Sequence, residues 1–146
     1  MTKKILVIHG PNLNMLGKRE PEQYGTSTLE EINIDLKNHG KKIGIAVDFF
    51  QSNHEGAIVE KIQDAHDAYA GLIINPAAYT HSSVAIRDAI LLLDMPVIEI
   101  HLSNIYKRES FRHQSLMADV VTGQITGFGM QGYIIALDAI ISLINQ

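Results

Sequence analysis

Apolar and polar positions follow one another in blocks that predict strands and helices in turn. The predicted strands are short apolar, β-branched runs at 5–9, 43–51, 72–74, 96–102 and 119–125. The predicted helices carry apolar residues at helical spacing over 27–40, 52–71, 82–93 and about 130–144. Serines near the helix starts, such as Ser27 with Glu30 and Ser52 with Glu55, form capping boxes.

Strands that alternate with helices predict an α/β fold with a parallel sheet. We expect one domain over residues 1–146, with a three-layer, flavodoxin-like arrangement. Its five-stranded sheet has the first strand central and helices on both faces. Ligands of such sheets bind outside the carboxyl ends of the strands. Polar residues gather after the first, third and fourth predicted strands, in 12–24, 75–81 and 101–112.

Composition narrows the classes of function. A hydrophobic content of 46% with 19% charged residues is ordinary for a globular domain, and the net charge of −4 argues against a nucleic-acid surface. The chain has no cysteine, so it has no disulfide framework or thiolate nucleophile. No apolar run approaches membrane-spanning length, and the first strand follows Met1 too closely for a signal peptide. We therefore expect a cytoplasmic protein that does not bind membranes.

About fifteen residues separate the first strand from the next helical pattern, where two to six are usual. This stretch carries Asn12, Arg19 and Tyr24 between glycines and prolines, as an active-site lid does. Tyr24 is a candidate general base. A tyrosine titrates near 10, so a base at neutral pH needs about 4 kcal/mol of phenolate stabilisation, which a nearby cation such as Arg19 supplies. The alternative is a tyrosine that only packs the loop.

Glu99 and His101 are two residues apart on a predicted strand, so their side chains share a face. A buried glutamate needs a partner, and a histidine held by one can act as a general acid. The alternative places both at the surface.

The remaining candidates suit a small anion. Arg108 and Arg112 could clamp it, or could simply be solvated. Asn75 could present its amide to a ligand or tie down its own turn. His81 and Asp88 share a face if the helix reaches back to His81.

Two sequence patterns resemble known binding motifs but do not indicate the corresponding sites. Gly127-Phe-Gly-Met-Gln-Gly132 matches the dinucleotide motif but follows the last strand, so it is a turn into the final helix. His9, His81 and His101 could form a zinc site of a hydrolase, but their spacing lacks the short pairing of metal sites.

The stretch Ile8-His-Gly-Pro-Asn-Leu-Asn-Met-Leu-Gly-Lys-Arg-Glu-Pro-Glu-Gln-Tyr-Gly25 resembles the signature of type II 3-dehydroquinate dehydratases. The stretches from Asn75 to Ala85 and from Glu99 to Asn104 also resemble that family. The resemblance implies dehydration of 3-dehydroquinate to 3-dehydroshikimate through an enolate. It implies no Schiff base, metal or organic cofactor. A small-anion-binding module of the same fold without catalysis is the alternative.

The resemblance also implies a role for each candidate. Tyr24 is the base, Arg19 helps to hold it as phenolate, and Asn12 stabilises the enolate through a water. His101 is the acid and Glu99 orients it. The implied substrate contacts are Asn75, His81, Asp88, Leu102, Ser103 and Arg112, with Arg108 as a further lid residue. Asp88 is expected from a neighbouring subunit of a homododecamer, a tetramer of trimers. The final helix, apolar nearly all round, fits such contacts, or burial on its own sheet alone.

Overall fold

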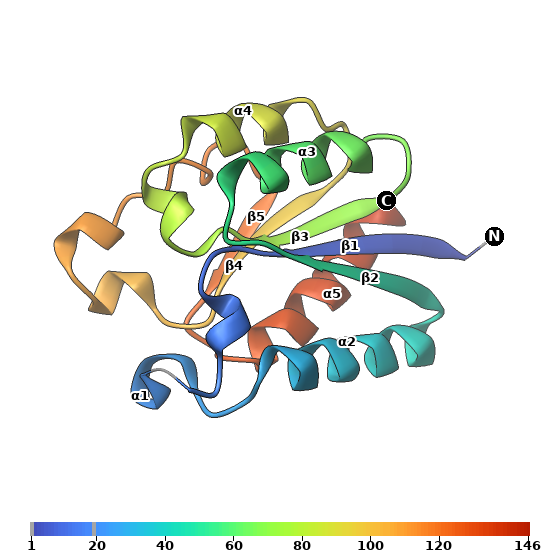
Figure 1. The fold of residues 1–146 in the computed structure, drawn as a ribbon. Helices are drawn as coiled ribbons and strands as arrows, with labels where there is room; N and C mark the ends of the chain where they lie inside the picture. The colour runs from blue at the N-terminus through green and yellow to red at the C-terminus, as the bar shows by residue number, and fades with distance from the viewer. Residues whose placement is uncertain (1, 19) are drawn as a thin grey trace.

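The structure is a computed structural model that describes residues 2–18 and 20–146, and it has three layers (Figure 1). The middle layer is a parallel five-stranded sheet in the order β2-β1-β3-β4-β5, so the predicted α/β fold is confirmed. The first strand lies between β2 and β3. The strands are β1 (Lys3–His9), β2 (Ile45–Gln51), β3 (Gly71–Asn75), β4 (Val97–His101) and β5 (Gly123–Thr126).

Helices cover both faces of the sheet (Figure 1). The helices α2 (Leu29–Ile43) and α5 (Gln131–Ile144) lie on one face, and α3 (Glu55–Ala65) and α4 (Val84–Leu91) lie on the other. No helix within residues 2–18 or 20–146 is long and apolar enough to cross a bilayer.

Alternation along each strand divides the buried side chains into two cores. In β1, Ile5 and Val7 pack with α2 and α5, while Leu6 and Ile8 pack with α3 and α4. All four side chains are fully buried, and each such burial contributes about 1.5–3 kcal/mol. The sheet is therefore fixed from both sides, and its strand ends form a rigid base for loops.

Several helix ends differ from the predicted ones. The N-cap of α2 is Thr28, whose hydroxyl accepts from the amide of Glu31 at 3.2 Å, and not Ser27. Helix α2 also continues past Gly40 to a left-handed cap at Gly44. Helix α3 begins after His54, because Ser52 accepts from the His54 amide and turns the chain before the helix starts.

The third helix and the fifth strand are shorter than predicted. Helix α3 ends at Ala65, and Gly71 already belongs to β3. Residues 117–121 form a turn in which Met117 accepts hydrogen bonds from Val120 and Val121. Those valines pack on the core as part of the turn, so their apolar character does not indicate a strand.

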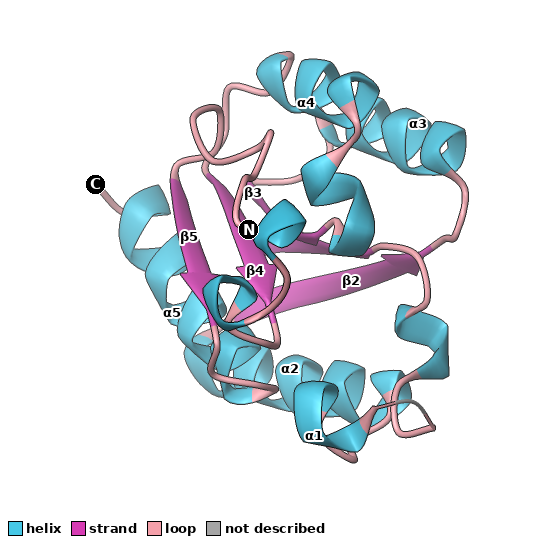
Figure 2. Cartoon of the chain, turned by 90° about the vertical axis from the view of Figure 1, so that its left-hand side faces the viewer, coloured by secondary structure: helices cyan, strands magenta, loops and turns pink. Residues whose placement is uncertain are grey.

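The connections at the carboxyl edge of the sheet are irregular (Figure 2). After β1 the chain makes a 3-10 turn at Leu13–Met15 and the short helix α1 (Pro21–Tyr24). After β3 it makes a 3-10 turn at Ala77–His81, and after β4 two more at Ile105–Lys107 and Ser110–Arg112. All three connections lie at the edge where the sequence predicts the ligand.

Gly10 lets the ends of β1 and β3 approach closely. Its amide donates to the Asn75 carbonyl at 2.8 Å, and a Cβ there would lie 2.7 Å from the Pro76 oxygen and 2.8 Å from the Asn75 oxygen. Both obstacles are backbone atoms, which cannot swing away as side chains do.

We predict that Gly10→Ala lowers the unfolding free energy by about 1–3 kcal/mol, because the strand ends must separate to admit a methyl group. Urea denaturation measures the change. The matched control is Gly56→Ala in α3, where a Cβ meets nothing within 4 Å and the helix gains up to about 1 kcal/mol. Equal stability of Gly10→Ala and the unsubstituted protein would contradict the close-approach argument.

Candidate active site

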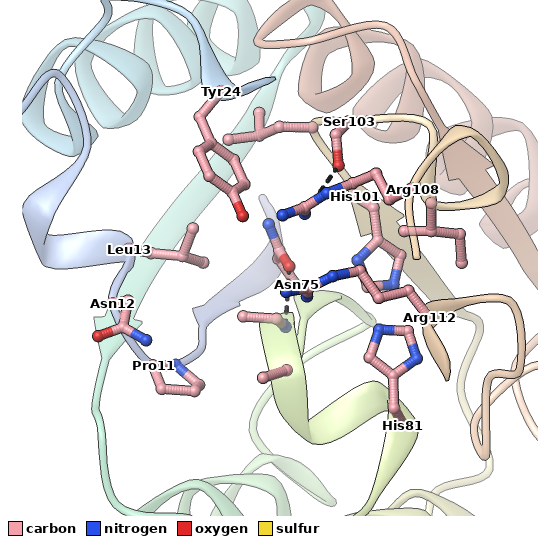
Figure 3. A pocket seen from close by; sticks show the side chains of 14 residues that line it. Pro11, Asn12, Leu13, Tyr24, Asn75, His81, His101, Ser103, Arg108 and Arg112 are labelled. Atoms are coloured by element: carbon pink, nitrogen blue, oxygen red, sulfur yellow. Dashed lines mark hydrogen bonds between the residues drawn. The ribbon is translucent and has the colours of Figure 1, made fainter. Parts of the chain in front are cut away.

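A cavity of about 150 Å³ opens at the carboxyl ends of β1, β3 and β4 (Figure 3). Side chains from all three predicted loops contribute to it. The predicted residues that line it are Asn12, Tyr24, Asn75, His81, His101, Leu102, Ser103, Arg108 and Arg112. The sheet thus brings together segments up to about a hundred residues apart.

His101 is held from behind by a buried carboxylate. Its Nε2 lies 2.7 Å from Oε2 of Glu99, which has no exposed surface. A carboxylate only accepts hydrogen bonds, so Nε2 carries a proton and its N–H donates a hydrogen bond to Glu99. This leaves Nδ1 of His101 as the nitrogen available to the cavity. The two side chains pair as predicted. Both are buried, so the alternative that places them at the surface is wrong.

Three further side chains donate to Glu99. The Thr80 hydroxyl lies 2.7 Å from Oε2, the Ser115 hydroxyl 2.9 Å from Oε1, and the Gln124 amide 2.7 Å from Oε1. Burial alone would raise the pKa of Glu99. The hydrogen bonds and charge of His101, with the bonds from Thr80 and Ser115, outweigh burial and hold that pKa below its usual value. Glu99 is therefore a fixed negative charge beside the imidazole.

Tyr24 lies across the cavity from these groups, with its hydroxyl pointing inward (Figure 3). It is the last residue of α1, and its ring lies 5.2 Å from the guanidinium carbon of Arg108. The Arg108 side chain is only 10% exposed, and it donates to the Ser103 hydroxyl at 3.4 Å. A largely buried cation therefore lies against the phenol ring at this wall of the cavity.

Arg112 and His81 form the opposite wall of the cavity. Arg112 is oriented by Glu109, whose carboxylate oxygen lies 3.0 Å from its Nε. His81 donates from Nδ1 to the Gln114 carbonyl at 2.8 Å. Burial, and to a lesser degree the positive charges of His101 and Arg112, lower the pKa of His81. A neutral His81 leaves Nε2 as an acceptor for a hydroxyl group.

Asn12 and Asn75 lie at the ends of β1 and β3. The Asn12 backbone is left-handed (φ 69°), and its amide donates to the Asn53 side chain at 2.9 Å. Asn75 is almost fully buried, and its Oδ1 accepts from the Ala77 amide at 3.0 Å. Asn75 therefore ties down its own turn and also lines the cavity, and a contact from its amide to a ligand stays a prediction.

The predicted substrate contact Asp88 is not brought to this cavity. Asp88 is exposed on α4 and does not line it, and α4 begins at Val84, so the helix does not reach back to His81. His81 lies instead in the preceding 3-10 turn. The prediction for Arg19 falls outside the described residues.

The donors to Glu99 were not predicted from the sequence. Gln124 faces Glu99 directly in the parallel register of β4 and β5, so the register of the predicted fifth strand would have indicated it. Thr80 and Ser115 lie in irregular segments, and no periodic signal marks them.

The zinc alternative has no ligand cluster in the described part of the chain. Within residues 2–18 and 20–146, no group of three or more His, Cys, Asp or Glu side chains is placed to hold a metal ion. His81 and His101 stack at 6.5 Å, while His9 lies on the other face of the sheet with both ring nitrogens hydrogen-bonded.

The fold and the site define a flavodoxin-like α/β protein with titratable groups around a small, positively lined cavity. The sequence profile of a family described as dehydroquinase class II matches residues 3–141. A 3-dehydroquinate dehydratase of Halothermothrix orenii is 53% identical over 143 residues, 98% of this chain and 97% of that protein. One of Ruegeria pomeroyi is 56% identical over 136 residues, 93% and 91% of the two chains.

Solved structures are similar over the whole chain. A type II dehydroquinase from Butyrivibrio crossotus has a TM-score of 0.94 at 48% identity, covering 96% of this chain and 98% of that one. One from Propionibacterium acnes has a TM-score of 0.93 at 42% identity, covering 100% and 99%. The chain belongs to the type II dehydroquinase family, so it is an enzyme, a lyase.

We predict that Glu99→Gln lowers the unfolding free energy at pH 7 by about 1–3 kcal/mol, because the new NH₂ group must face buried donors. The pKa of Glu99 lies below 4.5, its value in an unfolded chain. The carboxylate therefore stabilises the fold above pH 4.5, and this contribution is lost as the pH falls further.

Urea denaturation of both proteins at pH 7 and below pH 4.5 tests this prediction. The stability gap between them should narrow in acid, whereas Glu60→Gln on the exposed face of α3 should be neutral throughout. A gap that stays constant as the pH falls would show that the charge of Glu99 is not the source.

Proposed function

We propose that this protein dehydrates 3-dehydroquinate to 3-dehydroshikimate through an enolate, in the shikimate pathway of aromatic amino acid biosynthesis. The two homologues named above are 3-dehydroquinate dehydratases, and the family match covers nearly the whole chain. One observation carries the proposal. The Tyr24 hydroxyl and the Glu99-held His101 face the same small cavity from different walls.

Tyr24 acts as the base and His101 as the acid. The Tyr24 phenolate takes the proton alpha to the ketone, and the electron pair of that C–H bond becomes the enolate. His101, as the imidazolium, then gives its Nδ1 proton to the departing hydroxyl. The hydroxyl leaves as water while the enolate returns to the ketone and the new C=C bond forms. Proton transfer from Tyr24 back to His101 through solvent resets the enzyme. Acid and base are thus provided by groups in separate electrostatic environments.

The cationic side chains match the charge of the substrate and of the intermediate. Arg108 lies against the Tyr24 ring, and Arg112 contributes positive charge at the opposite wall. Arg19 is proposed to help hold Tyr24 as phenolate, and Asn12 to hold a water against the enolate oxygen. Asn75 with the backbone at Leu102 and Ser103 binds the carboxylate, and His81 binds a hydroxyl.

The reaction needs no Schiff base in this proposal. A Schiff base requires a lysine desolvated near the carbonyl. Among the described residues, those that line the cavity include no lysine, whereas a tyrosine and a histidine stand ready for proton transfer.

The proposed assembly is a homododecamer, a tetramer of trimers, working in the cytoplasm. Asp88 lies on α4 beside exposed apolar side chains, of which Val84 is 59% and Leu91 57% exposed. A neighbouring subunit packed on this helix would cover these side chains. Asp88 would then lie near the cavity of that neighbouring subunit. Light scattering of the purified protein would measure the subunit number.

The experiment that tests the proposed activity follows the ultraviolet absorbance of the conjugated product after addition of 3-dehydroquinate. The protein is first treated at length with a chelator. A rise in absorbance supports the dehydratase and removes the metal-hydrolase alternative. Folded protein that binds 3-dehydroquinate without any rise would support the alternative, a small-anion-binding module without catalysis.

We predict that Tyr24→Phe folds normally and loses at least about a thousandfold in kcat, because the substituted ring cannot take a proton. The control is Tyr106→Phe, an exposed loop tyrosine outside the cavity lining, which should retain its activity. Circular dichroism checks the fold, and the absorbance assay measures kcat. Turnover near that of the unsubstituted protein would rule out Tyr24 as the base.

A further inference from the structure

Four polar side chains form a hydrogen-bonded chain through the core beneath the cavity. The Asn33 oxygen lies 2.8 Å from His9 Nε2, and His9 Nδ1 lies 3.1 Å from the Tyr133 hydroxyl. That hydroxyl lies 3.3 Å from Nδ2 of Asn75. The four residues come from α2, β1, α5 and β3, and His9 and Tyr133 have no exposed surface. The proposed reaction uses only Asn75 among them.

The hydrogen bonds of this chain have only one consistent direction. The Ala77 amide donates to Asn75 Oδ1, so Asn75 presents its NH₂ group to Tyr133 and Tyr133 must accept. The hydroxyl proton of Tyr133 then needs an acceptor, and His9 Nδ1 is the one within reach. A neutral imidazole that accepts at Nδ1 carries its proton on Nε2, which donates to Asn33. The opposite tautomer would place two donors on the Tyr133 oxygen.

The protonation state and the orientation of the His9 ring are also fixed. Burial lowers its pKa to about 4, although the hydrogen bond to Asn33 opposes the shift, so the ring is neutral at neutral pH. The ring stacks in parallel on Phe49 with centroids 6.3 Å apart, which limits its rotation. His9 therefore offers Tyr133 an acceptor of constant position.

We infer that His9 is a positioning residue that acts through the Tyr133 hydroxyl to hold the Asn75 amide with its free N–H toward the cavity. An amide held this way can donate to a ligand but cannot accept from one. It therefore selects an acceptor such as a carboxylate at this point of the cavity. The inference rests on the proposed function in taking Asn75 as the anchor of the substrate carboxylate.

Two measurements test the inference, and the first does not depend on activity. Nitrogen NMR of protein labelled in its histidine rings reports the tautomer of His9, assigned by the signal missing in His9→Asn. We expect the Nε2–H tautomer, unchanged between pH 5 and pH 8. The Nδ1–H tautomer would overturn the inference, whether or not the protein turns over 3-dehydroquinate.

The second measurement separates KM from kcat for 3-dehydroquinate. Tyr133→Phe and His9→Leu should raise KM about three- to tenfold, the worth of one hydrogen bond, with a smaller effect on kcat. His9→Asn should restore KM nearly to the original value, because its side-chain oxygen can take the place of Nδ1. Tyr69→Phe is the matched control, since it loses a hydroxyl bonded to Asp48 and away from the cavity.

An unchanged KM in Tyr133→Phe and His9→Leu would overturn the inference, as would an equal rise in His9→Leu and His9→Asn, which would indicate a packing role. No turnover by the unsubstituted protein would instead refute the proposed function. In that case the NMR result still decides the tautomer, and calorimetry with 3-dehydroquinate decides whether Tyr133→Phe weakens binding.

Discussion

A carboxylate without exposed surface needs a hydrogen-bond donor at each oxygen. Because Glu99 is such a carboxylate, several segments around the candidate active site must place donors next to it. Its donors come from the turn after β3, from the loop after β4 and from β5. These segments must converge on β4 before the negative charge is tolerable. The same convergence closes the wall of the cavity and holds His101 in one orientation. The acid function proposed for His101 and the local folding therefore depend on the same group, Glu99.

The sequence was sufficient for the fold and most of the cavity lining. The periodicity of the apolar residues places five strands and four long helices, and a parallel sheet then sends the ends of β1, β3 and β4 to one edge. Polar side chains just after those strands had to meet there, as Tyr24, Asn75 and His101 do. Strand alternation also placed Glu99 and His101 on one face. These inferences succeed because they depend on strand geometry and hardly on loop conformation.

Other features depend on contacts that no periodicity encodes. Thr80 and Ser115 reach Glu99 from irregular segments, so only the folded chain identifies them. The apolar residues before β5 resemble a strand but pack as a turn, so the predicted strand began too early. It contained Gln124, but the sequence did not give its register against β4. His9 was weighed only as a zinc ligand. Its actual role in the core follows from Asn33 and Tyr133, which are distant in sequence.

The two faces of the sheet supply different parts of the active site. Glu99 and His101 point toward the core under α3 and α4, whereas His9 and Asn75 point toward α2 and α5. The two sets of side chains therefore lie on opposite faces of the sheet, with the sheet backbone between them. Substitutions in one core therefore affect the proposed proton donor, and substitutions in the other affect the proposed anchor for the ligand. Within such an architecture, natural selection can adjust reaction rate and ligand preference independently of each other.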